Sequence, residues 1–301
     1  MDTSRRPKQI MENICRFSRF RFPTSITRMS SSTNPPALPI YFLSHGGPPI
    51  LDWKHHPAYS AFQRFGKEVS NLKPKGIIVL SAHFAGGRDE IFINEAELTD
   101  LIYDFYGFPR HYYQKKFPHR GSPELASEIS KLLAAENIKS RLVKRGLDHG
   151  VWVPFSIAFD SNNPLEVPIV QVSIYAGEDP GKHIALGKAL ASLRQSYVIV
   201  NSGQAVHNLR DLSFDETDVL PYVKPFDKAL ESAMTESVGG EREDAMLKLL
   251  KRSDARAAHP TFDHILPIYV AIGAGSNARG KQIFNHREGS LGWAQYRLDE
   301  V

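Results

Sequence analysis

The sequence is poor in cysteine, with Cys15 alone among 301 residues. One thiol forms neither an intramolecular disulfide nor a cysteine-based zinc cluster, so a disulfide-stapled scaffold is excluded and any metal must be held by His, Asp or Glu. The sequence also lacks an apolar run of about 18 to 20 residues, the length that a membrane helix needs. We therefore expect a cytoplasmic protein that is not embedded in a membrane.

The surplus of positive charge is small, because 37 basic residues face 33 acidic ones and leave a net charge of +4. Much of the surplus lies in residues 1–36, an Arg- and Ser-rich leader in which Asp2 and Glu12 are the only acids. The leader resembles a mitochondrial targeting segment, and a flexible extension is an equally good interpretation. No basic helix with interleaved aromatic residues follows it, so we expect no nucleic-acid partner.

Beyond the leader, short apolar runs alternate with segments of helical periodicity, and no repeat interrupts them. Strands that are covered on both faces are expected at residues 39–43, 76–80, 167–174 and 197–200. Helices are expected at residues 57–72, 122–136, 180–193 and 225–251. This alternation predicts one α/β domain over residues 37–301, a three-layer sandwich with a central, mostly parallel sheet.

Three of the four expected strands are followed by a polar stretch that contains a histidine. These histidines are His45, His83 and His207. In open α/β sheets, ligands bind at the carboxyl ends of the strands, so three side chains that are far apart in the sequence are expected to converge. One such histidine alone is more often structural, whereas three at equivalent positions favour a functional site.

Two further histidines have informative surroundings. His264 lies just ahead of an expected helix that begins near Pro267, and its spacing of five residues from His259 does not place the pair on one helical face. We expect one of the two to bind a ligand and the other to pack or hydrogen-bond. His149 lies in Asp148-His149-Gly150, which by itself is more typical of a turn with a solvated histidine. Because nucleophile elbows and phosphate-binding loops are absent, a histidine-bound metal is the strongest chemical hypothesis.

These histidines belong to a series of short motifs: Ser44-His45-Gly46, Ser81-Ala82-His83-Phe84, Asp148-His149-Gly150, Ser202-Gly203 with Val206-His207-Asn208-Leu209, and His259-Pro260 with Asp263-His264. In this order, over about residues 38–295, the series resembles the 4,5-DOPA extradiol dioxygenase branch of the LigB-type (class III) extradiol ring-cleavage dioxygenases. The resemblance implies a LigB-like α/β fold and an enzyme that opens a catechol ring beside its hydroxyls with O₂, using one divalent metal ion, Fe(II) or Zn(II).

The resemblance also implies roles for individual residues. His45, His83 and His264 match the metal ligands, His207 matches the acid–base histidine, and His149 matches a histidine that faces the substrate. Three neutral imidazoles suit Zn(II) as well as Fe(II), so the identity of the metal stays open.

Acid–base chemistry on a catechol needs a base for the second hydroxyl proton, and an imidazole with the usual pKa of about 6.5 meets this need. We assign that task to His207. Asp148 and Asp263 are candidates for fixing imidazole tautomers, although either could instead cap a turn. The aromatic segment 101–117 either walls a pocket for an aromatic ring or packs a long connection onto the sheet.

Two other functions stay open. A zinc hydrolase would use the same three histidines to hold a metal-activated water, and a non-catalytic protein would resemble the Memo proteins, which look like the same fold. The expected partners are a small catechol and O₂, with no nucleic acid and no membrane. We expect a monomer or a small homo-oligomer.

Overall fold

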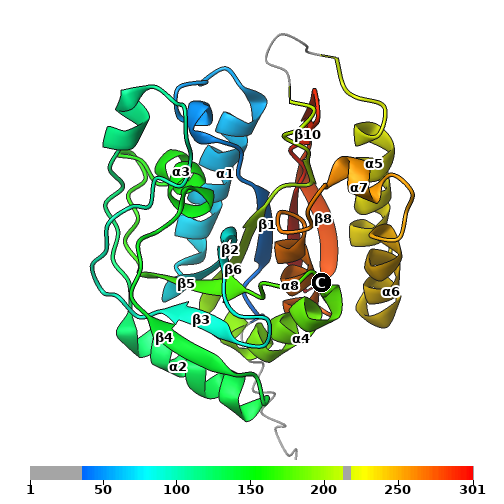
Figure 1. Cartoon of the computed structure of the whole chain (residues 1–301). Coiled ribbons are helices and arrows are strands. Elements are labelled where there is room, and N and C mark those ends of the chain that lie inside the picture. The colour runs from blue at the N-terminus through cyan, green and yellow to red at the C-terminus, as the bar shows by residue number, and fades with distance from the viewer. Residues whose placement is uncertain (1–35, 213–217, 301) are drawn as a thin grey trace, which may run out of the picture. The chain divides into compact units, whose positions relative to one another are not determined.

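The computed structural model describes residues 36–212 and 218–300. At its centre lies an eight-stranded sheet of strand order β4-β3-β5-β2-β6-β1-β11-β8 (Figure 1). The bounds of its strands are β1 Ile40–Ser44, β2 Gly76–Ala85, β3 Ile91–Asn94, β4 Ser140–Val143, β5 Ile169–Ile174, β6 Tyr197–Gly203, β8 Arg279–Phe284 and β11 Gln295–Asp299. β5, β2, β6 and β1 are mutually parallel, whereas β11 pairs antiparallel with β1 and β8 pairs antiparallel with β11. The expected mostly parallel sheet is confirmed.

Helices cover both faces of this sheet. Their bounds are α1 Pro57–Leu72, α2 Pro123–Ala135, α3 His149–Ala158, α4 Pro180–Leu190, α5 Val223–Thr235, α6 Gly239–Leu249, α7 Ala255–Ala258 and α8 Leu266–Ala274, with the 3-10 turns η1 Pro48–Leu51, η2 Arg110–Gln114 and η3 Ala191–Gln195. Along β2, Ile77 and Val79 pack with α1 and α3, whereas Ile78 and Leu80 pack with α2, α4 and α8 on the opposite face (Figure 1). Side chains of a strand alternate between faces, so one fully apolar strand feeds two cores and produces the three-layer sandwich.

The local sequence starts several helices. Pro57 opens α1 after His56, whose Nδ1 accepts the Ala58 N–H at 3.2 Å, and Asp179 caps α4 by accepting the Lys182 N–H at 3.1 Å. These caps satisfy backbone donors that a helix leaves unpaired in its first turn. None of the helices in the described ranges is long and apolar enough to cross a membrane.

The structure differs from the sequence prediction in several elements. Four strands of the main sheet, β3, β4, β8 and β11, were not among the expected strands. The helix expected over residues 225–251 is interrupted after Thr235, and a second helix begins at Gly239, whose φ of +58° suits a residue without a Cβ. Helix α3 was not predicted, because it is apolar all round and buried and so shows no amphipathic period. A small antiparallel sheet of order β7-β10-β9 was also missed, since β7 Val206–His207, β10 Leu291–Gly292 and β9 Arg287–Glu288 each have only two residues.

The predicted leader, residues 1–36, lies outside the described residues except for Pro36. The boundary of the domain over residues 37–301 therefore stays a prediction.

Candidate metal centre

The carboxyl ends of three neighbouring parallel strands meet at one edge of the sheet. Ser44 of β1 pairs with Gly203 of β6, and β2 pairs with β6 as far as Ser81. His45 follows β1 directly and donates its backbone N–H to Gly203 O at 2.9 Å, while His83 lies two residues beyond Ser81 in β2. This register brings the rings of His45 and His83 together, with centroids 5.0 Å apart.

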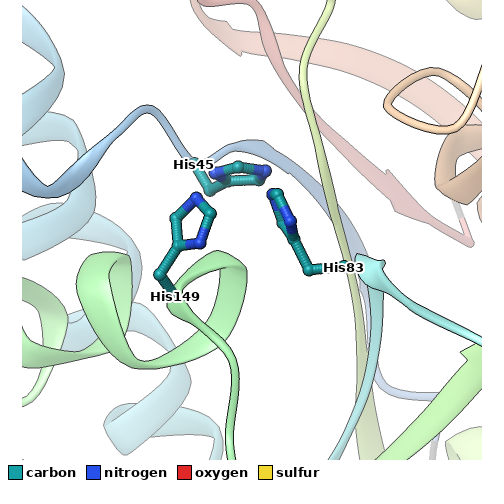
Figure 2. Close-up of side chains that lie close together, drawn as sticks. All are labelled: His45, His83 and His149. Atoms are coloured by element: carbon teal, nitrogen blue, oxygen red, sulfur yellow. The ribbon is translucent and has the colours of Figure 1, made fainter. Parts of the chain in front are cut away.

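Two histidines at helix starts complete a cluster of four. His149 is the first residue of α3, and its ring centroid lies 4.0 Å from that of His83 and 5.4 Å from that of His45. Figure 2 shows these three rings facing one another. His264 precedes α8, with its centroid 4.9 Å from that of His83 and 5.3 Å from that of His45. We call His45, His83, His149 and His264 the histidine cluster. The solvated turn that the tripeptide around His149 suggested by itself is wrong, because this side chain is buried.

Glycines allow this close approach. A Cβ on Gly150 would lie 2.6 Å from Ser81 Oγ, and one on Gly203 would lie 2.1 Å from His264 O. A side chain at either position would clash. Gly150 therefore lets the segment that carries His149 pack against the end of β2, and Gly203 lets the segment that carries His264 pack against the end of β6.

Hydrogen bonds set the tautomer of two of the imidazoles. His45 Nδ1 donates to Gly46 O at 2.7 Å, and His149 Nδ1 donates to Asp104 Oδ1 at 2.8 Å. Each bond leaves Nε2 as the nitrogen with a free lone pair. The Nε2 of His45 is buried and has no hydrogen-bond partner among the described residues. A buried, unpaired acceptor is costly unless a cation or a donor completes it.

The imidazoles of His83 and His264 face each other through their Nε2 atoms. His83 Nε2 lies 3.2 Å from His264 Nε2, while the Nδ1 of each ring lies 3.3 Å from a carboxylate oxygen, of Asp104 and Asp263 respectively. The two Nε2 atoms lie within hydrogen-bond distance, with the donor set by the tautomer. When both rings carry their proton on Nδ1, beside the carboxylates, a cation would take the place of this hydrogen bond, and 3.2 Å suits two ligands that each lie about 2.1 Å from one ion.

Burial keeps these imidazoles neutral, which is the form that binds metals. Burial, and then the charge that neighbouring imidazoles would carry, lowers the pKa of His45 and of His264 well below the usual value. Burial likewise lowers the pKa of His83 to about 4. The candidate ligand atoms of His45, His83 and His149 all lie within 4.8 Å of one another. These three imidazoles therefore fit one divalent ion. The sequence led us to assign His45, His83 and His264 as ligands; the structure groups His149 with the first two, and His264 lies beside His83.

Asp104 is the site residue that the sequence analysis missed. Besides His149 Nδ1, its Oδ1 accepts the His149 backbone N–H at 3.1 Å, and its Oδ2 faces His83. Burial alone would raise the pKa of Asp104, but the hydrogen bond and positive potential of His149 outweigh it and hold the pKa at about 2. Asp104 lies in the aromatic segment 101–117 and 45 residues from His149, and no local motif marks it.

Asp148 does not have the role considered for it. Its buried carboxylate accepts from Ser81 Oγ at 2.7 Å, from Arg145 Nη1 at 2.9 Å and from Gln171 Nε2. These hydrogen bonds go to Ser81, Arg145 and Gln171 and to no imidazole of the cluster, so Asp148 anchors the start of α3 and acts on His83 only through its charge. Asp263 does face an imidazole, that of His264.

His207 lies on the wall beside the cluster. Its ring stacks on that of His264, with centroids 3.6 Å apart and an angle of 11° between the planes. Burial, and then the charge that His259 would carry, lowers the pKa of His207 to about 3, which differs from the near-neutral pKa expected from the sequence. His259 itself is buried and its Nε2 hydrogen-bonds Ala205 O at 2.9 Å, so it packs in the core.

The cluster forms the floor of a cavity of about 510 Å³. Phe105, Tyr106 and Phe108 of the aromatic segment line it, whereas Tyr112 and Phe117 of the same segment pack in the core. Both interpretations of that segment hold, each for a different part of it. The cavity is large enough for an aromatic ring and is mostly apolar above the imidazoles.

Comparisons with known proteins find relatives of this chain. Residues 39–293 match the family described as the catalytic LigB subunit of aromatic ring-opening dioxygenase. The chain is 35% identical over 255 residues to the 4,5-DOPA dioxygenase extradiol of Beta vulgaris, covering 83% of this chain and 92% of that protein. It is 38% identical over 219 residues to a 4,5-DOPA dioxygenase extradiol-like protein of Schizosaccharomyces pombe, covering 71% and 72%. A crystal structure of an uncharacterized protein from Escherichia coli K12 superimposes with a TM-score of 0.71 at 25% identity, covering 86% of this chain and 99% of that one.

Proposed function

The chain belongs to the LigB family of aromatic ring-opening dioxygenases, and we propose that it is a metal-dependent extradiol dioxygenase that opens a catechol ring with O₂. The observation that carries the proposal is the histidine cluster that lines an apolar cavity, in which His45 Nε2 is buried without a partner among the described residues and the Nε2 atoms of His83 and His264 lie 3.2 Å apart. The family supplies the reaction type, and the cavity supplies a place for an aromatic ring.

We assign His45, His83 and His264 as the residues that hold the ion, Fe(II) or Zn(II). A set of three protein ligands leaves coordination positions open, so an ion held by these residues would supply sites for the catechol oxygens and O₂. Three imidazoles without a carboxylate leave the full charge of the ion uncompensated, which favours a dianionic catechol.

The remaining side chains handle protons and water. His207 is neutral at pH 7 and stands at the cavity wall, so it accepts a hydroxyl proton from the substrate; a bound anion raises its pKa and supports the transfer. His149 keeps its Nδ1–H on Asp104, so its Nε2 is an acceptor that faces the substrate. Phe105 and Phe108 cover the cavity and exclude water from the ring.

The proposal is tested by anaerobic reconstitution with Fe(II) or Zn(II), followed by a panel of catechols with an oxygen electrode. We expect one O₂ consumed per ring opened. His45→Ala, His83→Ala and His264→Ala should each lose most of the bound metal, whereas His111→Ala, on the surface, should keep it. Hydrolase activity without O₂ uptake, or full metal content in all three variants, would contradict the proposal.

A further inference from the structure

Glu288 stands on the same face of the small sheet as His207. Leu291 of β10 is the register partner of both His207 in β7 and Glu288 in β9. Residues directly opposite each other in a sheet point to the same side, and all three line the cavity. Two interstrand spacings separate His207 from Glu288, which is roughly 10 Å between their Cα atoms. A catechol ring beside His207 would therefore direct a short substituent past Leu291 towards Glu288.

Two side chains lie against the carboxylate of Glu288. Trp293 Nε1 donates to its Oε1 at 2.8 Å, and His56 Nε2 lies 3.3 Å from the same oxygen. Because His56 Nδ1 accepts the Ala58 N–H, His56 Nε2 carries the proton and is not free to bind a metal. Burial alone would raise the pKa of Glu288, but the hydrogen bond and potential of His56 outweigh it and lower the pKa, so Glu288 is ionised at pH 7.

Among the described residues, no Lys or Arg side chain pairs with Glu288. His286 Nε2 lies 3.8 Å from Glu288 Oε2, and burial lowers the pKa of His286. The adjacent Arg287 is occupied by Asp227, with Nη2 and Oδ2 2.6 Å apart. Within residues 36–212 and 218–300, no Lys or Arg lines the cavity. Glu288 Oε2 thus remains available to a ligand.

Close to Glu288, the described lining of the cavity is mostly apolar. Ile50, Trp53, Leu209 and Leu291 form walls there, and none of them carries a positive charge. A substrate carboxylate would meet these walls and the negative charge of Glu288, whereas an ammonium would pair with that charge in an environment that screens it poorly.

Resting on the proposed function, we propose that the substrate is a catechol whose side chain carries an amine and no carboxylate, and that Glu288 binds its ammonium. Glu288 is then the residue that sets specificity within the cavity. The relatives named for DOPA act, by those names, on an amino acid with both charges, so this chain would differ from them in rejecting the carboxylate.

Three probes that differ only in side-chain charge test this inference: 4-(2-aminoethyl)catechol, 4-methylcatechol and 3-(3,4-dihydroxyphenyl)propanoate. Kd is measured by calorimetry on the full chain, both metal-free and loaded with Zn(II), and kcat/KM on the Fe(II)-loaded protein. We expect wild type to prefer the amine over the neutral probe by roughly 10- to 100-fold, as for a hydrogen-bonded charge pair, and to bind the propanoate most weakly.

Glu288→Gln removes the charge and keeps an oxygen that accepts from Trp293. It should lower the ratio of amine to neutral affinity by about 10-fold or more, and Glu288→Lys should reverse the preference towards the propanoate. Glu97→Gln, an exposed carboxylate outside the cavity, makes the same change in net charge and should leave the ratio unchanged.

The outcomes separate this inference from the proposed function. If catechols are opened but wild type shows no amine preference, or Glu288→Gln leaves the ratio unchanged, the role of Glu288 is wrong and the dioxygenase proposal stands. If no catechol is opened, the Kd ratios still decide: a preference for the amine that is lost in Glu288→Gln supports the binding role, and equal ratios overturn it.

Discussion

Replacing Asp104 by asparagine should weaken metal binding without touching any candidate ligand. Two donors of one residue, the backbone N–H and Nδ1–H of His149, converge on Asp104 Oδ1 at 3.1 and 2.8 Å. They will hold the amide oxygen of an asparagine in that place, so its NH₂ group must face His83 Nδ1, 3.3 Å from Oδ2 in the wild type. An NH₂ group needs an acceptor, which drives the proton of His83 to Nε2 and removes the lone pair that would bind the ion.

Loss of a carboxylate that orients an imidazole ligand typically costs 10- to 100-fold in metal affinity, or about 1.4 to 2.8 kcal/mol. We expect a loss in this range for Asp104→Asn, measured for Zn(II) by competition with a chromophoric chelator. The thermal midpoint with excess Zn(II) should also rise less than that of the wild type.

Asp52→Asn is the matched control. Asp52 Oδ2 contacts His111 Nε2 at 2.8 Å, but its side chain is 42% exposed, so this histidine–carboxylate pair lies on the surface. Such pairs contribute under about 1 kcal/mol, and metal affinity should not change. Wild-type Zn(II) affinity in Asp104→Asn, or an equal loss in Asp52→Asn, would refute the tautomer argument.

Three other outcomes are expected. His207→Ala should keep near-normal metal content by elemental analysis and still bind a catechol, yet lose roughly 10²- to 10⁴-fold in turnover, and loss of the metal would make His207 a ligand. A chain without the leader, residues 1–36, should keep its thermal midpoint and activity, and a large loss of stability would show that the leader packs on the domain. Glu178 accepts the Phe262 N–H at 2.7 Å and pairs with Arg256, whose hydrogen bond lowers its pKa from 4.5. A carboxyl with a lowered pKa stabilises the fold above its unfolded pKa, so Glu178→Gln should lower the free energy of unfolding at pH 7 by less than about 1 kcal/mol. In denaturant titrations, this difference between variant and wild type should vanish as the pH falls below 4.5. A difference that persists at low pH would contradict the assignment.

The sequence by itself determined the framework of the site. Continuous apolar runs specify strands that are buried on both faces, and a parallel sheet aligns their carboxyl ends, so the convergence of His45 and His83 followed from two motifs and one topological rule. Local chemistry also determined where His264 lies, because Pro267 restricts the helix start just beyond it.

Only the tertiary structure decided what surrounds the imidazoles. Asp104 meets His149 across 45 residues, and Glu288 reaches the cavity through strands of two residues that carry no periodic signal. Helix α3 could not be predicted from the sequence, because a helix that is buried on all sides has no polar face and therefore no amphipathic periodicity. The pKa of His207 likewise depends on burial against neighbours from other elements. Composition and spacing determine where the strands lie and which strand ends carry histidines. The tautomers of the imidazoles, the charges around them and the walls of the cavity depend on contacts between distant segments, which exist only once the chain has folded.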